Sequence, residues 1–258
     1  MAIPDSVNCK LFRAKEHLDG VQVETQKYYQ ANPARIVRQQ EGSPDEFIGK
    51  VVTDAPIPQK IPLIVGDFLQ NLRSSLDYLV WELVLSAKNI PDHNSMFPIC
   101  TTSEAFKSQL ARHRLDGVPA SAIAEIDALQ PYQDGQGAKA NVLAMIDDLC
   151  NVNKHRRILT TILYGGQAPS DLVTQEIDGQ IFANVSFESI LKQGTKIGPF
   201  PMVDGPQGRF PKVDVPLNFV AFIAFDDGAA KNVEVGYTLS IFMGYVMQIL
   251  HNFEKFFT

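Results

Sequence analysis

The chain has 258 residues, of which 45% are hydrophobic and 20% are charged, and these proportions are ordinary for a globular protein. Its formal net charge of -6 argues against a broadly basic nucleic-acid-binding protein, because phosphate contacts supply most of the non-specific affinity for nucleic acids. Cys9, Cys100 and Cys150 form no Cys-x-x-Cys pair. We therefore expect a reducing, cytoplasmic compartment, no disulfide framework and no zinc site.

The first half of the chain predicts two long helices separated by a hairpin. Apolar residues recur at three- and four-residue steps from about 6 to 31, which predicts a helix that ends at Asn32-Pro33. Two short β-like runs, 34–39 and 47–53, are joined by a turn-rich segment and predict a hairpin. A second long helix is predicted at about 61–89.

The remaining elements alternate between helical and β-like patterns. Short helices are predicted at 103–114, where Thr102 or Ser103 can cap the start, and at 119–129. A third long helix is predicted at about 137–164, stopped by Gly165-Gly166. Further predicted elements are strands at 172–177, 181–187 and 219–225, a Gly/Pro-rich connection at 194–211, and a final helix at about 232–257.

These elements predict an α+β protein: an antiparallel helical bundle with a small antiparallel β-sheet. We expect the N-terminal hairpin to join the strands of the C-terminal-half insertion, because an isolated hairpin is marginal in water. The expected organisation is a single domain, 1–258. Its bundle would comprise about 1–31, 59–165 and 232–258, and its sheet about 33–55 and 168–230. The run from Val235 to Asn252 has no Asp, Glu, Lys or Arg, and its length and composition favour a core helix over a membrane span.

A polar cluster at residues 71–78 interrupts the second long helix. Projection at about 100° per residue places the leucines on one side of the helix and the polar residues on the other, with Arg73 at the edge. Arg73 and Asp77 are one helical turn apart and can therefore form an ion pair. One interpretation of this cluster is a solvated helix face with a single modest ion pair.

A second polar cluster, at residues 151–157, falls in the third long helix. Its projection places Asn153 and Arg156 inside the apolar stripe, so both side chains are expected to face the second helix, where Asp77 or Asp67 would pair with Arg156. On this projection Arg156→Ala should cost about 2–4 kcal/mol, against less than about 0.5 for Arg157→Ala.

The two clusters have a structural and a functional interpretation. The structural interpretation is a buried polar network that fixes the register of the two helices relative to each other. The functional one is a cleft lined by both clusters, to which we assign Arg73, Asp77, Asn153, His155 and Arg156.

Three motifs resemble those of a widespread family of uncharacterised bacterial proteins. They are Asn-Leu-Arg-Ser-x-Leu-Asp at 71–77, Phe-Pro-Ile at 97–99 and Asn-Lys-His-Arg at 153–156. The resemblance covers about residues 60–160 and implies no established activity. A looser similarity links the chain to HEPN helical bundles, many of which cleave RNA, and whose signature is an Arg, a polar residue, a short spacer and a His. Here Tyr78 stands where that His is expected.

Two classes of function follow. The first is a non-catalytic binding or interaction module with an unknown ligand or protein partner and no membrane. The alternative is a HEPN-like, metal-independent endoribonuclease acting on RNA as a homodimer. If the chain is HEPN-like, the catalytic residues would be Arg73, Asp77 and His155. The family's pattern does not include a histidine at position 155; we infer that His155 replaces the missing one from the neighbouring helix. Binding roles are assigned to Asn71, Tyr78, Asn153, Lys154 and Arg156.

Overall fold

The computed structural model describes residues 3–31, 35–39, 46–52, 55–158, 160–166, 174–177, 180–183, 191–192, 196–205, 208–211 and 219–257. The chain divides into two compact units. The helical unit comprises 1–24, 59–160 and 225–258, and the β unit comprises 25–58 and 161–224. The fold is α+β, a helical bundle with antiparallel β-structure, as the sequence predicts. That the two units form one domain stays a prediction.

The helical elements lie close to the predicted ranges. They are α1 Asp5–Ala31, α2 Lys60–Ser86, α3 Ser103–Ala111, α4 Ala120–Ala128, the 3-10 segment η1 Pro131–Ala140, α5 Val142–His155, α6 Val235–Phe253 and the 3-10 turn η2 Glu254–Phe256. The predicted cap of α3 is confirmed, because the Thr102 hydroxyl accepts a hydrogen bond from the Ala105 amide at 3.1 Å. Asn141 and Glu234 cap α5 and α6 in the same way.

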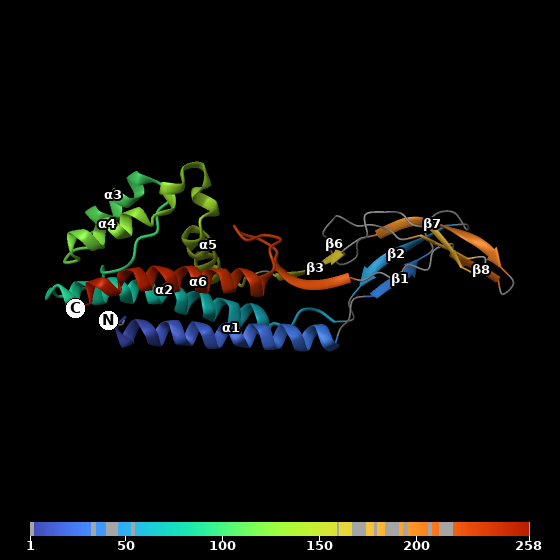
Figure 1. The fold of residues 1–258 in the computed structure, drawn as a ribbon, viewed down its shortest axis with the longest axis horizontal. Helices are drawn as coiled ribbons and strands as arrows, with labels where there is room; N and C mark the ends of the chain where they lie inside the picture. The colour runs from blue at the N-terminus through green and yellow to red at the C-terminus, as the bar shows by residue number, and fades with distance from the viewer. Residues whose placement is uncertain are drawn as a thin grey trace. The chain divides into compact units, whose positions relative to one another are not determined.

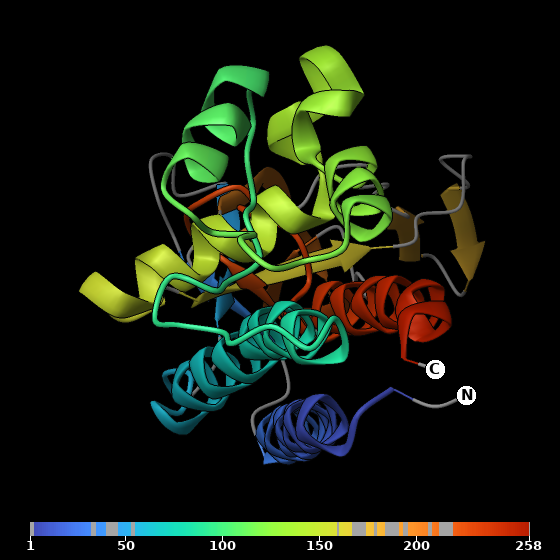
Figure 2. The same cartoon turned by 90° about the vertical axis from the view of Figure 1, so that its left-hand side faces the viewer.

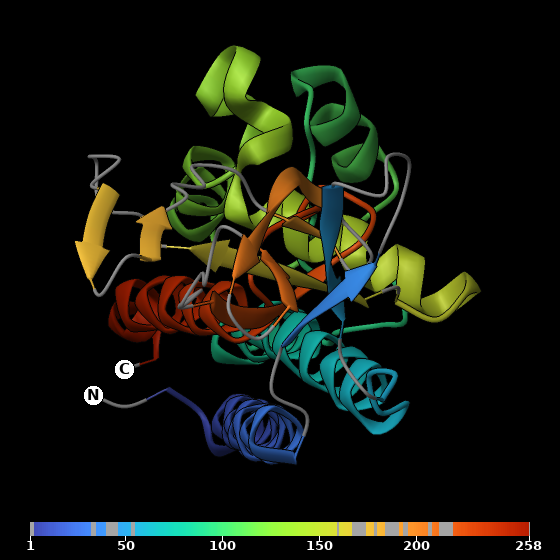
Figure 3. The ribbon, with the colours of Figure 1, turned by 90° about the vertical axis from the view of Figure 1, so that its right-hand side faces the viewer.

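Helices α1 and α2 pack antiparallel over their length. Near the start of α1 the Ser6 hydroxyl donates to Glu82, and further along Lys10 lies over the Tyr78 ring. Lys60, the first residue of α2, reaches Glu24 of α1. Figure 1 shows α6 beside α2 and running in the same direction, and Figures 2 and 3, which look along the bundle from opposite ends, show α2 next to both α1 and α6.

The core of the helical unit follows from the apolar stripe of α2. Every third or fourth residue of this helix, including Leu69, Leu72, Leu76, Leu79 and Leu83, is fully buried, which is the spacing of one helix face. Phe242 and Phe253 of α6 are buried as well, so α6 is amphipathic. Within the described residues, no helix combines the length and apolarity that crossing a membrane requires.

Helix α5 lies across α2 (Figure 2), and their contacts confirm that the second and third predicted helices pack together. The Cys150 thiol donates to the carbonyl of Leu69 at 3.5 Å. One turn earlier on α5, Asp147 approaches Arg73, and one turn later Asn153 lies beside Gly66. α2 therefore carries α1 on one flank and α5 on another.

The predicted third helix at 137–164 is wrong at both ends. The chain forms η1 before Asn141, and α5 ends at His155, after which Arg156 is extended and residues 160–166 form strand β3. The β-branched residues at 158, 160, 161 and 162 favour a strand because branching at Cβ restricts their helical rotamers. The apolar spacing in this segment fits a helix as well as a strand, and the projection assumed that a single helix continued through it.

Five of the strand pairs in the described part of the chain are antiparallel. Their bounds are β1 Arg35–Gln39, β2 Glu46–Val52, β3 Thr160–Gly166, β4 Thr174–Ile177, β5 Gln180–Ala183, β6 Leu191–Lys192, β7 Lys196–Gly205, β8 Gly208–Pro211 and β9 Phe219–Phe225. One sheet has the order β1-β2-β7-β8, another β6-β3-β9, and β4 pairs with β5. β2 pairs with β7, which confirms that the N-terminal hairpin joins the later strands.

The Gly/Pro-rich stretch 194–211, expected to be a connection, carries two strands. β7 and β8 pair antiparallel through it, with Val203 opposite Phe210. Proline is tolerated at the ends and edges of sheets, where its missing amide leaves no central hydrogen bond unmade. Composition alone therefore underestimated the β content of this segment. Residues 178–179 and 184–187, which belong to the predicted turn and to the strand at 181–187, lie outside the described residues.

Candidate functional site

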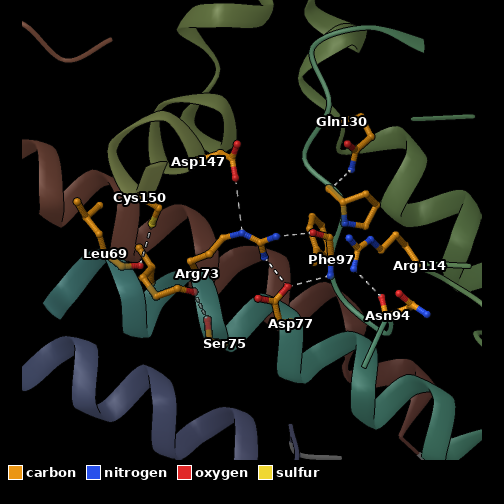
Figure 4. A network of polar contacts seen from close by, with 12 residues as sticks. Leu69, Arg73, Ser75, Asp77, Asn94, Phe97, Arg114, Gln130, Asp147 and Cys150 are labelled. Atoms are coloured by element: carbon orange, nitrogen blue, oxygen red, sulfur yellow. Dashed lines mark hydrogen bonds and ion pairs between the residues drawn. The ribbon is translucent and has the colours of Figure 1, made fainter. Parts of the chain in front are cut away.

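Arg73 and Asp77 together hold both backbone polar groups of Phe97, a residue of the segment that follows α2. Arg73 Nη1 donates to Asp77 Oδ1 at 2.6 Å, which confirms the predicted pair along α2. Arg73 Nη2 donates to the carbonyl oxygen of Phe97 at 2.6 Å, and the Phe97 amide donates to Asp77 Oδ1 at 3.0 Å (Figure 4). The ion pair therefore satisfies both backbone polar groups of Phe97, as a neighbouring strand would.

Gln130 holds the next residues of the same segment. Its side chain is 1% exposed. Its Oε1 accepts from the Cys100 amide at 2.9 Å, and its Nε2 donates to the carbonyls of Pro98 at 2.9 Å and Ile126 at 3.0 Å. All the polar atoms of this buried amide are thus paired.

We call Arg73, Asp77 and Gln130 the clamp, and residues 97–100 the clamped segment. The segment belongs to no helix or strand, and the Phe97 ring is fully buried. The Cys100 carbonyl accepts from the Tyr132 amide, and just before the segment the Met96 amide donates to the Arg114 carbonyl. A buried segment outside regular secondary structure needs other partners for its backbone, and the clamp supplies several of them.

The charges in the clamp are mostly buried. The Arg73 side chain is 14% exposed and that of Asp77 33%. Burial raises the pKa of the Asp77 carboxyl above its ordinary value, and the charge of Arg73 and the Phe97 amide oppose that rise. A second carboxylate, Asp147 of α5, lies 3.8 Å from Arg73 Nε. The guanidinium is therefore surrounded by acceptors of this chain.

Of the predicted residues on the second polar cluster, only Asn153 faces α2. A Cβ added at Gly66 would lie 2.8 Å from the Asn153 side-chain carbon Cγ. Lys154 and His155 are exposed. The prediction that Arg156 points at α2 is wrong: it follows the end of α5, its side chain is 52% exposed, and it forms an ion pair with Asp227. Because the Arg156 side chain is half exposed while that of Asp227 is only 20% exposed, Arg156→Ala should cost about 1–2 kcal/mol rather than 2–4.

The close contact at Gly66 makes a testable prediction about α2 and α5. Gly66→Ala should lower stability by about 1 kcal/mol, because overpacking against Asn153 outweighs the helix-propensity gain. In an Asn153→Ala background the same change should stabilise by about 0.5–1 kcal/mol, because the space is then free. Urea denaturation of the four proteins measures this coupling. An equal effect of Gly66→Ala in both backgrounds would show that the two positions do not meet.

The remaining predicted site residues lie apart from the clamp. Asn71 donates its side-chain amide to the Asp67 carbonyl of its own helix at 2.9 Å. Tyr78 is 41% exposed and lies toward α1, with Lys10 Nζ 5.2 Å from its ring centre. The structure thus brings Arg73 and Asp77 together and places Asn71, Tyr78 and His155 elsewhere.

The two buried cysteines are poor nucleophiles at neutral pH. Burial raises the pKa of the Cys150 thiol to about 12 and that of the Cys100 thiol to about 11. Since the thiolate is the reactive form, neither residue is suited to covalent catalysis. Among the residues that the structure describes, no three His, Cys, Asp or Glu side chains gather where they could hold a metal ion.

Gln130 and Asp147, which take part in the polar contacts around Arg73 and the clamped segment, were not assigned to the site from sequence. Gln130 lies one residue beyond the helix predicted at 119–129, yet it continues the buried face of α4 at Ala122 and Ile126 in steps of four. A glutamine on such a face indicates a buried amide that needs partners. Asp147 gave no comparable signal, because its proximity to Arg73 depends on how α5 crosses α2.

Comparison of the chain with protein-family models, with curated proteins and with solved structures gives no match. The resemblances to the uncharacterised bacterial family and to HEPN bundles therefore stay predictions, and the functional argument rests on the geometry of the described residues.

Proposed function

We propose that this protein is a non-catalytic binding or interaction module in which the clamp has a structural role. The observation that carries the proposal is that the Arg73 side chain is engaged by acceptors of its own chain. Its two terminal nitrogens donate to Asp77 and Phe97, and its Nε faces Asp147. Each terminal nitrogen of this guanidinium already donates to an acceptor of this chain, so an external anion would have to compete with Asp77 and Phe97 for Arg73. The cytoplasmic compartment expected from the unpaired cysteines is part of the proposal.

The same geometry weakens the HEPN-like alternative. That activity would need Arg73 to contact a scissile phosphate and a nearby acid–base group to transfer protons. Arg73 is largely buried and paired, Tyr78 lies toward Lys10, and His155 is an exposed residue in the last turn of α5. A phosphate bound through Arg73 would compete with Asp77 and the Phe97 carbonyl for the guanidinium.

An RNA cleavage assay tests the proposal. Purified protein incubated with mixed RNA in excess chelator should give no cleavage, and Tyr78→His should give none either, because Arg73 stays engaged. Gel analysis of the RNA over time measures the result.

His155→Ala is the control that separates catalysis from stability. His155 is exposed, so this change should leave the thermal midpoint nearly unchanged. Metal-independent cleavage by the wild type that falls by about 100-fold in His155→Ala, the scale of losing an acid–base group, would contradict the proposal.

A further inference from the structure

One face of α6 is exposed and carries no charged residue. We call it the α6 face; it consists of Tyr237, Ser240, Ile241, Gly244, Met247, Gln248 and His251. Tyr237 is 66% exposed, Ile241 41% and Met247 50%. The opposite side of α6 is buried in the bundle. In a chain of net charge -6, an exposed helix face of this length without charge requires an explanation.

The α6 face is self-complementary about Gly244. Projection at about 100° per residue places Gly244 on the midline of the face, with Ile241 and Met247 at equal angles on either side. A second α6 crossing antiparallel at Gly244 would bring the apolar Ile241 against Met247. It would also bring the polar Ser240 against Gln248, and Tyr237 against His251. Each pair joins residues of similar character, as a twofold interface requires.

Gly244 allows such a crossing to be close. A Cβ added at this position would meet no atom of the described residues within 4 Å. Within its own helix this glycine costs about 0.5–1 kcal/mol relative to alanine, and no contact among the residues that the structure describes requires it. A glycine at the crossing point of two helices lets their backbones approach.

The absence of charge on the α6 face allows a second copy of this chain as the occupant that its self-complementarity indicates. Interface centres are depleted of charged residues, and two uncharged faces meet without the repulsion that the net charge imposes on the rest of the surface. The glutamates at the ends of the face are engaged within their own chain. Glu234 accepts from the Gly236 and Tyr237 amides, and Glu254 contacts His251 at 3.2 Å.

We propose that the protein forms a twofold homodimer through the α6 face, with the two α6 helices crossing antiparallel at Gly244. The homodimer rests on the proposed function in one respect: it supplies the partner that an interaction module requires. Failure of one does not imply failure of the other, because RNA cleavage and molecular mass are measured separately.

Sedimentation equilibrium of the full chain tests the dimer. At concentrations up to about 100 µM, the wild type should approach twice the 28.6 kDa of the chain. Gly244→Gln should raise the dissociation constant at least ~10-fold, because its side chain separates the helices. The same change should leave the thermal midpoint of the monomer equal or higher, because glutamine favours helix over glycine.

Charge variants test the register. Ile241→Glu and Met247→Lys should each weaken the dimer at least ~10-fold, because each buries an unpaired charge. The double variant should recover association, because each new carboxylate then meets a new ammonium of the other copy. Gln70→Glu, at an exposed position of α2, is the matched control and should leave the mass unchanged. A monomeric wild type, a dimer insensitive to Gly244→Gln, or a double variant as weak as the single ones would overturn the proposal.

Discussion

Arg73→Met should destabilise the protein by about 2–4 kcal/mol at neutral pH. The change leaves Asp77 without its cation and the Phe97 carbonyl without its donor. Removing one partner of a fully buried ion pair costs about 3–5 kcal/mol, and the expected value is lower because a third of the Asp77 side chain stays exposed. Urea denaturation at several pH values measures the effect.

The loss should grow as the pH rises. Burial already raises the pKa of Asp77, and the charge of Arg73 counteracts that rise. Without Arg73 the folded-state pKa moves further above that of the unfolded chain. A carboxyl whose pKa is raised by folding loses stability as the pH rises from its unfolded pKa through its folded one. The variant should therefore differ least from the wild type near pH 4, where Asp77 begins to be protonated in both states.

Two control variants identify the source of this pH dependence. Arg73→Met combined with Asp77→Asn should show little extra pH dependence relative to the wild type, because the amide carries no charge at any pH and can still accept from the Phe97 amide. Arg157→Ala, at an exposed position, should change stability by less than about 0.5 kcal/mol. A loss in Arg73→Met that is equal at pH 4 and pH 8 would mean that Arg73 does not offset the Asp77 charge.

Gln130→Met should cost about 3–5 kcal/mol. Methionine fills a similar volume but leaves the Cys100 amide and the carbonyls of Pro98 and Ile126 without partners in a buried site. Each stranded group costs about 1–3 kcal/mol, and partial relaxation limits the sum. Chemical denaturation measures the loss, and hydrogen exchange at the Cys100 amide should show the local opening.

Gln133→Met is the matched control, three residues further along. Gln133 is exposed and donates one hydrogen bond, to the Asp127 carbonyl at 3.1 Å. Because water can replace that bond, the change should cost less than about 1 kcal/mol. Similar losses in the two variants would show that Gln130 does not hold the clamped segment.

Local sequence determined most of the helical elements. The apolar spacing of α2 and the Asn32-Pro33 stop after α1 place these helices to within a few residues, because helix periodicity and the restriction before proline act within one or two turns. The Arg73–Asp77 pair is equally local, since residues one turn apart face the same way. Thr102 as a cap is another such case.

The tertiary structure decided what lies opposite those residues. α5 ends at His155 because the next residues enter a sheet, so Arg156 meets Asp227 while Arg73 becomes the guanidinium held against the core. The partners of the clamp, Phe97 and Gln130, lie 24 and 57 residues after Arg73 in the printed sequence. The periodicity of the sequence does not indicate contacts between residues so far apart in the chain, because hydrogen bonds between remote segments depend on how whole helices pack.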